Sequence, residues 1–66
     1  MTIIINNQPK ELEQGIALQA LLASLEIATN GIAVAINNAV IPRSEWAVKQ
    51  LNADDNVMII QATQGG

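Results

Sequence analysis

The chain has 66 residues, half of them hydrophobic, and a net charge of −3 from six acidic and three basic side chains. This length allows one small domain, and three scattered cations form no basic stripe, so neither nucleic acid nor an anionic membrane is expected as a partner. Cysteine, histidine and tyrosine are all missing from the sequence. Disulfides are thereby excluded, the usual zinc ligands and side-chain nucleophiles are lacking, and we expect a protein that is not an enzyme and binds no metal.

The acidic residues also give little support to catalysis. Asp54 and Asp55 fall in a polar turn, where we expect both carboxylates to be solvated rather than paired as an acid and a base. No apolar run approaches 18 residues, and residues 1–5 lack the basic charge and the length of a signal peptide. The protein is therefore expected to be cytoplasmic.

The first part of the chain predicts a hairpin followed by a helix. The β-branched residues 2–6 predict a strand, residues 6–9 a turn, and residues 10–13 a polar strand at the edge of a sheet. A helix is predicted over residues 16–26 by leucines at positions i, i+3, i+4 and i+7: Leu18, Leu21, Leu22 and Leu25. Its N-cap is weak, because Ala17 stands where serine, threonine or aspartate is preferred.

The second part of the chain predicts further strands. Residues 32–37 alternate strictly between large apolar side chains and alanine, which is typical of a strand. Weaker elements follow in chain order: a turn at Asn37-Asn38, a short strand over residues 39–41 that ends at Pro42, and an irregular or single-turn segment over 43–46. A brief strand over 48–51, a turn over 52–56 and a last strand over 57–61 complete the sheet.

This order predicts an α+β fold, with a mixed four- to five-stranded sheet and one main helix across one face. The domain would span residues 1–61, followed by a flexible tail over residues 62–66. Strand alternation directs one apolar set toward the helix: Ile3, Ile5, Val34, Ile36, Val57 and Ile59. A second apolar set is left on the opposite face, where it predicts a partner surface unless the register is shifted by one residue: Ile4, Ala33, Ala35, Met58 and Ile60.

The sequence ends in a pair of glycines, which chance produces in about 0.5% of chains at a glycine usage of roughly 7%. A frayed end or a cloning remnant would look the same. Without a Cβ atom, however, Gly65 and Gly66 could enter a narrow cleft, and residues 62–66 reach roughly 16 Å when extended. We therefore predict a tail that presents the carboxylate of Gly66 to a partner. Its other residues are Ala62, Thr63, Gln64 and Gly65.

Several segments match one known family over nearly the whole chain: Ala35-Ile36-Asn37-Asn38, Val40-Ile41-Pro42-Arg43, Trp46-Ala47, Asp55, Val57, Ile59, Gln61 and Gly65-Gly66. With the order of the elements, they resemble the ubiquitin-like β-grasp fold and, within it, the ThiS family of thiamine-biosynthesis sulfur carriers. The chain departs from the family pattern at two positions. Ala17 replaces a frequent capping residue, and Asp54 replaces a usual glycine, which aspartate can mimic in a left-handed conformation.

The resemblance implies a protein co-substrate that binds no cofactor of its own. A ThiF-like adenylating enzyme would use ATP and magnesium to convert the Gly66 carboxylate into an acyl-adenylate. A persulfide on a donor protein would then leave a thiocarboxylate on Gly66. A ThiG-like thiazole synthase would take the sulfur and build it into the thiazole of thiamine.

The sequence leaves alternatives open for the function and for two side chains. The small subunit of molybdopterin synthase shares the fold, the Gly-Gly end and the thiocarboxylate chemistry, and a ubiquitin-like binding module would use the apolar face alone. Trp46 fits either a packing residue that closes one end of the core or a partner contact. Arg43 fits either a surface ion pair or a contact with the partner enzyme.

Overall fold

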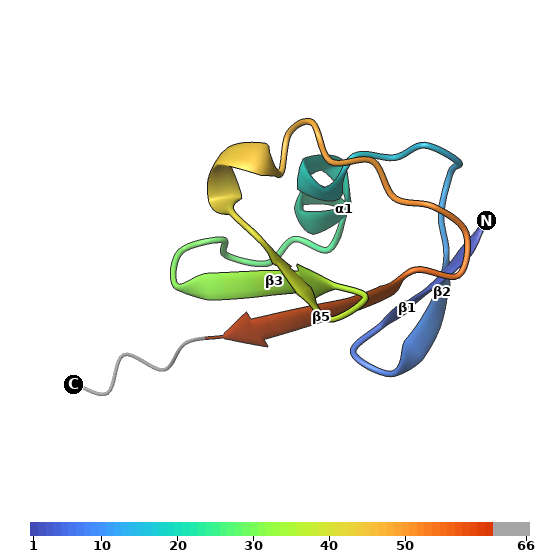
Figure 1. The fold of residues 1–66 in the computed structure, drawn as a ribbon, viewed down its shortest axis with the longest axis horizontal. Helices are drawn as coiled ribbons and strands as arrows, with labels where there is room; N and C mark the ends of the chain where they lie inside the picture. Colours follow the sequence, from blue (N-terminus) through green and yellow to red (C-terminus); the bar gives the residue numbers. More distant parts are fainter. Residues whose placement is uncertain (62–66) are drawn as a thin grey trace.

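The computed structural model describes residues 1–61, in which a five-stranded sheet packs against one α-helix and one short 3₁₀-helix (Figure 1). The elements in chain order are β1 (Thr2–Ile5), β2 (Gln8–Glu11), α1 (Leu18–Ser24), β3 (Ile32–Ile36), β4 (Ala39–Ile41), η1 (Arg43–Glu45) and β5 (Asn56–Gln61). The predicted α+β class with a mixed sheet is confirmed. The predicted tail, residues 62–66, lies outside the described residues.

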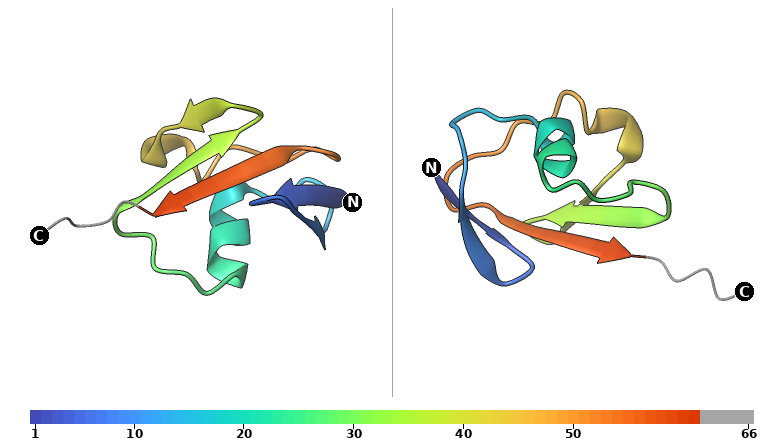
Figure 2. Two further views of the ribbon diagram at one scale, coloured as in Figure 1. Left: turned by 90° about the horizontal axis from the view of Figure 1, so that it is seen from below. Right: turned by 180° about the vertical axis from the view of Figure 1, so that it is seen from behind.

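The strand order in the sheet is β2-β1-β5-β3-β4, so the last strand occupies the centre. β5 pairs in parallel with β1 and antiparallel with β3, and it lies between the β1–β2 hairpin and the β3–β4 hairpin (Figure 2). Two hairpins formed from local sequence are therefore joined by a strand that is far away in the chain.

Both hairpins close through an Asn-Asn pair. Asn6 and Asn7 have φ angles of 49° and 70°, and Asn37 and Asn38 have φ angles of 52° and 70°. Positive φ at both central positions defines the two-residue type I′ turn, whose twist matches that of the strands. Asparagine is one of the few residues that adopt this conformation readily, so the sequence places both turns.

The first turn is shorter than predicted, and the prediction that it extends to Pro9 is wrong. β2 already begins at Gln8, which pairs with Ile5, and Pro9 lies inside the strand opposite Ile4. The Leu12 N–H donates to the Met1 carbonyl at 2.7 Å, and the alternation of the ladder from there turns the nitrogen of Pro9 to the outer edge. Proline is tolerated at that position because no ladder hydrogen bond is lost.

Helix α1 packs its leucines on the sheet as predicted. Leu18, Leu21 and Leu22 are fully buried, and Leu25 is half-buried. The helix ends at Ser24, earlier than the predicted residue 26, because Glu26 has a φ angle of 57° and so cannot continue a right-handed helix.

Backbone carbonyls from the η1 region cap the start of α1. Ala17 is the N-cap residue, as predicted, and makes no side-chain capping bond. The Leu18 N–H donates to the Lys49 carbonyl at 2.8 Å, and the Gln19 N–H donates to the Trp46 carbonyl at 3.0 Å. These bonds satisfy two of the four N–H groups that the first turn of a helix leaves open.

The predicted strand over residues 48–51 is wrong, because this segment bonds to the start of α1 instead of to the sheet. In the described chain this segment forms a single bridge, between Gln50 and Ala17. The Leu51 N–H also donates to the Ile16 carbonyl at 2.9 Å. The segment therefore pairs with the residues just before the helix and serves as its cap rather than as a strand of the sheet.

Ala17→Thr is expected to raise the free energy of unfolding by about 0.5–1 kcal/mol. In the described part of the chain the Ala20 N–H has no backbone partner, and a threonine hydroxyl at the N-cap can accept it. Urea denaturation measures the change. The control is Ala23→Thr, an exposed helical site where threonine lowers helix propensity and should destabilise by a few tenths of a kcal/mol. An unchanged midpoint for Ala17→Thr would contradict the assigned helix start.

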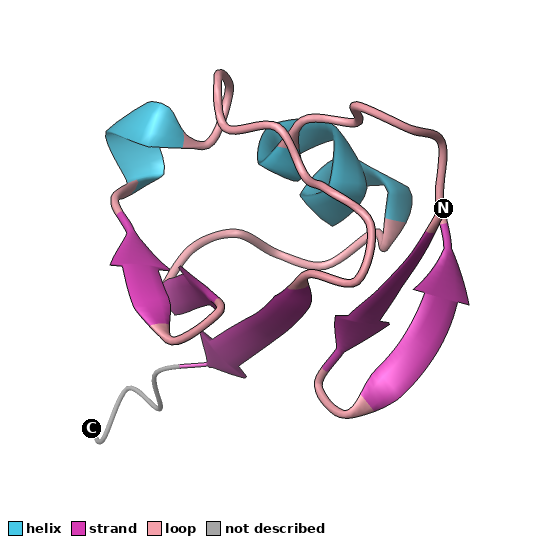
Figure 3. Cartoon of the chain, turned by 45° about the vertical axis from the view of Figure 1, so that its right-hand side comes forward, coloured by secondary structure: helices cyan, strands magenta, loops and turns pink. Residues whose placement is uncertain are grey.

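The hydrophobic core lies between α1, η1 and one face of the sheet (Figure 3). Its buried side chains are Ile3, Leu18, Leu21, Leu22, Val34, Ile36, Trp46, Leu51 and Val57. Ile5 and Ile59 pack against this cluster at partial burial. The predicted inward face of the sheet is therefore confirmed, and the one-residue register shift is excluded.

Candidate functional site

The outer face of the sheet carries the second apolar set where the sequence predicted it. Ala33 pairs with Ile60 and Ala35 with Met58, so these four residues lie side by side on β3 and β5, and Ile4 lies on the neighbouring strand β1. Met58 is 37% exposed and Ile60 is 53% exposed. In the described chain both helical elements lie on the other side of the sheet (Figure 3), so nothing there covers these side chains.

The sequence prediction missed one member of this surface. Val40 on the edge strand β4 pairs with Ala35 and is 72% exposed. The two-residue Asn37-Asn38 turn contained the signal, because a turn of that length fixes the register and puts Val40 on the same face as Ala35. We define the open-face patch as Ile4, Ala33, Ala35, Val40, Met58 and Ile60.

The open-face patch leads directly to the predicted tail. β5 contributes Met58 and Ile60 and ends at Gln61, at the opposite side of the molecule from the N-terminus (Figure 1). The predicted tail residues lie outside the described residues, and their role stays a prediction: Ala62, Thr63, Gln64, Gly65 and Gly66.

Trp46 is a packing residue of the core and not an exposed partner contact, the other role that its sequence position allowed. Its side chain is 2% exposed, and its indole Nε1–H donates to the Ile41 carbonyl at 3.0 Å. The buried ring thereby connects the end of β4 to the core, and the hydrogen bond removes the penalty of burying the indole N–H.

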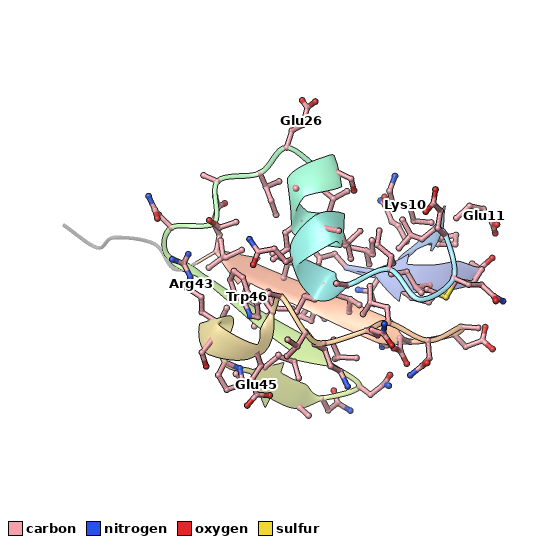
Figure 4. All side chains as sticks on the ribbon, turned by 90° about the horizontal axis from the view of Figure 1, so that it is seen from above. Lys10, Glu11, Glu26, Arg43, Glu45 and Trp46 are labelled. Carbon is pink, nitrogen blue, oxygen red and sulfur yellow. The ribbon has the colours of Figure 1, made fainter. Side chains whose placement is uncertain are left out.

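Arg43 has partners within the chain. Its guanidinium lies 5.2 Å from the centre of the Trp46 ring, a cation–π geometry, and donates a hydrogen bond to the Thr29 carbonyl. Figure 4 shows Arg43 beside Trp46, far from the charged side chains Lys10 and Glu11 of β2. The contacts tie η1 to the loop between α1 and β3, and a role of Arg43 in partner binding stays a prediction.

The expectation that both aspartates of the turn before β5 are solvated is wrong for Asp55. Its side chain is 8% exposed and accepts hydrogen bonds from Asn37 Nδ2 at 3.1 Å and from the Asn52 N–H at 2.8 Å. Asp54 is exposed and has a φ angle of 69°, so it takes the left-handed conformation considered for it from its sequence position. Asp55 thus holds the turn together from inside.

Among residues 1–61, no three histidine, cysteine, aspartate or glutamate side chains lie close enough together to hold a metal ion. Within the same residues, no helix is long and apolar enough to span a membrane.

In residues 1–61, one α-helix across a mixed five-stranded sheet, with a parallel pair at its centre and an apolar outer face, defines a ubiquitin-like β-grasp protein. The family model of the ThiS family matches residues 3–66. The sulfur carrier protein ThiS of Escherichia coli (strain K12) is 32% identical over 66 residues, which cover all of both chains. The chain belongs to the ThiS family, the sulfur carriers of thiamine biosynthesis. This membership favours the thiamine carrier over the molybdopterin synthase subunit.

Solved structures confirm the fold independently. The crystal structure of the thiamine biosynthesis protein ThiS from Geobacter metallireducens matches with a TM-score of 0.87 at 22% identity, and the match covers all of both chains. The solution structure of a thiamine biosynthesis protein from the same organism matches with a TM-score of 0.79 at 22% identity, over all of this chain and 88% of the other.

A longer protein also contains a similar stretch. The thiazole synthase of Magnetococcus marinus is 33% identical over 66 residues, which cover all of this chain and 20% of that protein. The chain therefore spans about a fifth of that relative's length.

Proposed function

We propose that this protein carries sulfur as a thiocarboxylate on Gly66 and acts as a co-substrate of other enzymes. The observation that supports this most directly is the continuity of β5, which carries Met58 and Ile60 of the open-face patch and leads at Gln61 into the residues that end in Gly65-Gly66. A partner docked on the patch is thus held beside the segment that it modifies. Membership of the ThiS family supports the same chemistry.

The first step activates a carboxylate, whose oxygen is a poor leaving group. A Gly66 oxygen attacks the α-phosphorus of ATP on a ThiF-like adenylating enzyme, and pyrophosphate leaves. Magnesium on that enzyme neutralises the phosphate charge. The product is an acyl-adenylate, which makes the Gly66 carbonyl carbon reactive toward a sulfur nucleophile.

The second step puts sulfur on the chain end. The terminal sulfur of a persulfide on a donor protein forms the C–S bond, and AMP leaves. A second thiol then cleaves the S–S bond, becomes part of a disulfide, and releases the thiocarboxylate. The sequence contains no cysteine, so no thiol of the carrier competes for the activated carbonyl.

The sulfur is then delivered to a ThiG-like thiazole synthase. The relative from Magnetococcus marinus, named a thiazole synthase, contains a stretch similar to this whole chain. Covalent linkage gives the carrier-like stretch a high effective concentration at the enzyme to which it is joined. This arrangement supports an interaction between this protein and a separate thiazole synthase chain.

Intact mass spectrometry tests the proposal. The chain is incubated with its cognate adenylating enzyme, ATP, magnesium and a sulfur donor, and the expected change is the replacement of one oxygen by one sulfur, localised to Gly66. A reaction without ATP is the control and should leave the mass unchanged. An unmodified chain in the presence of an enzyme that is active on another carrier would contradict the proposal.

A C-terminal extension separates the sulfur carrier from a binding module. One alanine added after Gly66 removes the glycine carboxylate and leaves residues 1–61 unaltered. If the protein is a sulfur carrier, the extended chain should lose sulfur incorporation. If it is a module that uses only the open-face patch, the extended chain should bind its partner as the wild type does, and neither the wild-type nor the extended chain should gain sulfur.

A further inference from the structure

The distal half of β5 has a neighbouring strand on one side only within the described residues. β1 pairs with β5 at Ile4–Asn56 and Ile5–Val57, whereas β5 continues to Gln61. Figure 2, left, shows β5 running past the β1–β2 hairpin while β3 accompanies it on the other side. The side of residues 59–61 that faces away from β3 is called the free edge of β5 below.

Backbone groups point out of this free edge. The Asn37 N–H donates to the Asn56 carbonyl at 2.8 Å, and in an antiparallel ladder every second residue then bonds to β3. Val57, Ile59 and Gln61 therefore turn their N–H and carbonyl groups to the β1 side.

Asn6, which follows β1, provides hydrogen bonds to β5 for one residue beyond the last β1–β5 pair. Its backbone N–H donates to the Val57 carbonyl at 3.0 Å, and its side-chain Oδ1 accepts from the Ile59 N–H at 2.8 Å. Beyond this point the described residues provide no partner for the Ile59 carbonyl or the Gln61 N–H. The strand thus offers one acceptor and one donor, spaced as in an unpaired sheet edge.

An apolar pocket lies along the same edge, on the helix side of the sheet. Its volume is about 300 Å³, enough for one large apolar side chain. The residues that line it are Ile5, Asn6, Leu25, Ile27, Ala28, Ile32, Ile59 and Gln61. Ile27, in the loop after α1, is 37% exposed. Ile59 and Gln61 belong to both the pocket and the free edge.

We propose that the free edge of β5 binds an extended segment of a protein partner, which adds a strand to the sheet and places an apolar side chain in the pocket. In such strand addition the main-chain hydrogen bonds supply affinity, and a pocket that receives alternate side chains supplies selectivity. Side chains of the added strand that face away from the pocket would lie beside Met58 and Ile60 of the open-face patch.

This inference rests on the proposed function for the choice of partner, which is the adenylating enzyme. An enzyme that reacts with Gly66 must come within five residues of Gln61, roughly 16 Å of extended chain. A second copy of this chain has no such reason to approach this edge, and the Gln61 variants distinguish it from the enzyme.

Two substitutions at Gln61 test the strand addition. Gln61→Pro removes the free N–H, and Gln61→Ala removes the same side chain but keeps the N–H. Proline breaks no hydrogen bond of the described structure here, and Ile60 before it is already extended, as a residue before proline prefers. We expect Gln61→Pro to raise the Kd for the adenylating enzyme, measured calorimetrically without ATP, about five- to tenfold over Gln61→Ala.

Two matched charge substitutions test the pocket. Ile27→Asp puts a carboxylate on the pocket wall, whereas Val48→Asp puts the same charge at another apolar site, which is 76% exposed and outside the pocket. We expect Ile27→Asp to weaken binding of the same enzyme at least about tenfold and Val48→Asp to change it less than about twofold. Thermal melting of both variants confirms that they remain folded.

The outcomes separate this inference from the proposed function. Equal affinities for Gln61→Pro and Gln61→Ala would overturn the strand addition. So would a dimer of the wild-type chain that Gln61→Pro dissociates without any effect on enzyme binding. If the Gln61 and Ile27 variants lose affinity as expected but the wild-type chain gains no sulfur at Gly66, the docking edge stands and the sulfur chemistry is wrong.

Discussion

Deletion of Gly66 is expected to reduce thiocarboxylate formation at least about a hundredfold and to leave the melting temperature unchanged. The deletion moves the terminal carboxylate back by roughly 3.3–3.6 Å, and a misplacement of about 1 Å can already cost about a hundredfold in rate. Stability should not change, because the buried core residues of the described chain lie between Ile3 and Val57. Single-turnover reactions followed by intact mass measure the rate.

The matched control keeps the length of the chain. Thr63→Ala changes a side chain in the predicted tail but keeps the number of residues between Gln61 and the Gly66 carboxylate, so its rate should fall less than about tenfold. Sulfur incorporated on Gly65 of the truncated chain at the wild-type rate would show that position along the tail does not matter.

Local sequence patterns predicted the elements that local chemistry determines. The alternation of residues 32–36 gave β3 with its inward and outward faces, and the Asn37-Asn38 pair gave the turn after it. The leucine spacing gave the buried stripe of α1. In each case the period of the side chains or the conformational preference of asparagine acts within a few residues, so no distant partner is needed.

Errors occurred where a distant segment decides the conformation. Residues 48–51 have the composition of a strand, but Lys49 and Leu51 bond to the residues around the start of α1, more than 30 positions earlier. Asp55 lies in a polar sequence, and its burial depends in part on a hydrogen bond from Asn37, in the distant turn between β3 and β4. Neither partner can be recognised from the neighbouring sequence.

The open-face patch and the free edge of β5 also differ in how far the sequence could predict them. The open-face patch follows from strand alternation, so five of its members were predicted from the sequence. The free edge of β5 depends on where β1 stops pairing, at Ile5–Val57, and on the Asn6 side chain that bonds to Ile59. A parallel pairing between the first and last strands cannot be placed in register without the three-dimensional structure, and this part of the site was not predicted.

Trp46→Ala is expected to lower the free energy of unfolding by about 3–5 kcal/mol, a large share of the stability of so small a domain. Replacing a buried tryptophan by alanine typically costs about 3–5 kcal/mol, and a domain of this length has a free energy of unfolding of about 3–10 kcal/mol. The substitution also leaves the Ile41 carbonyl without its indole donor and removes the ring under Arg43. Far-UV circular dichroism in a urea titration measures the loss without depending on tryptophan fluorescence.

Trp46→Phe separates the contribution of ring packing to stability from that of the indole hydrogen bond. The same variant tests whether Trp46 also contributes to partner binding. Phenylalanine keeps an aromatic ring in the core but cannot donate to Ile41, so we expect a loss of about 1–3 kcal/mol and a chain that remains folded at 25 °C. Because Trp46 is 2% exposed, the folded variant should bind the adenylating enzyme as the wild type does. Val48→Ala, at an exposed site, should stay within about 0.5 kcal/mol of the wild type. Wild-type stability of Trp46→Ala, or weaker enzyme binding by folded Trp46→Phe, would assign Trp46 to the partner interface instead.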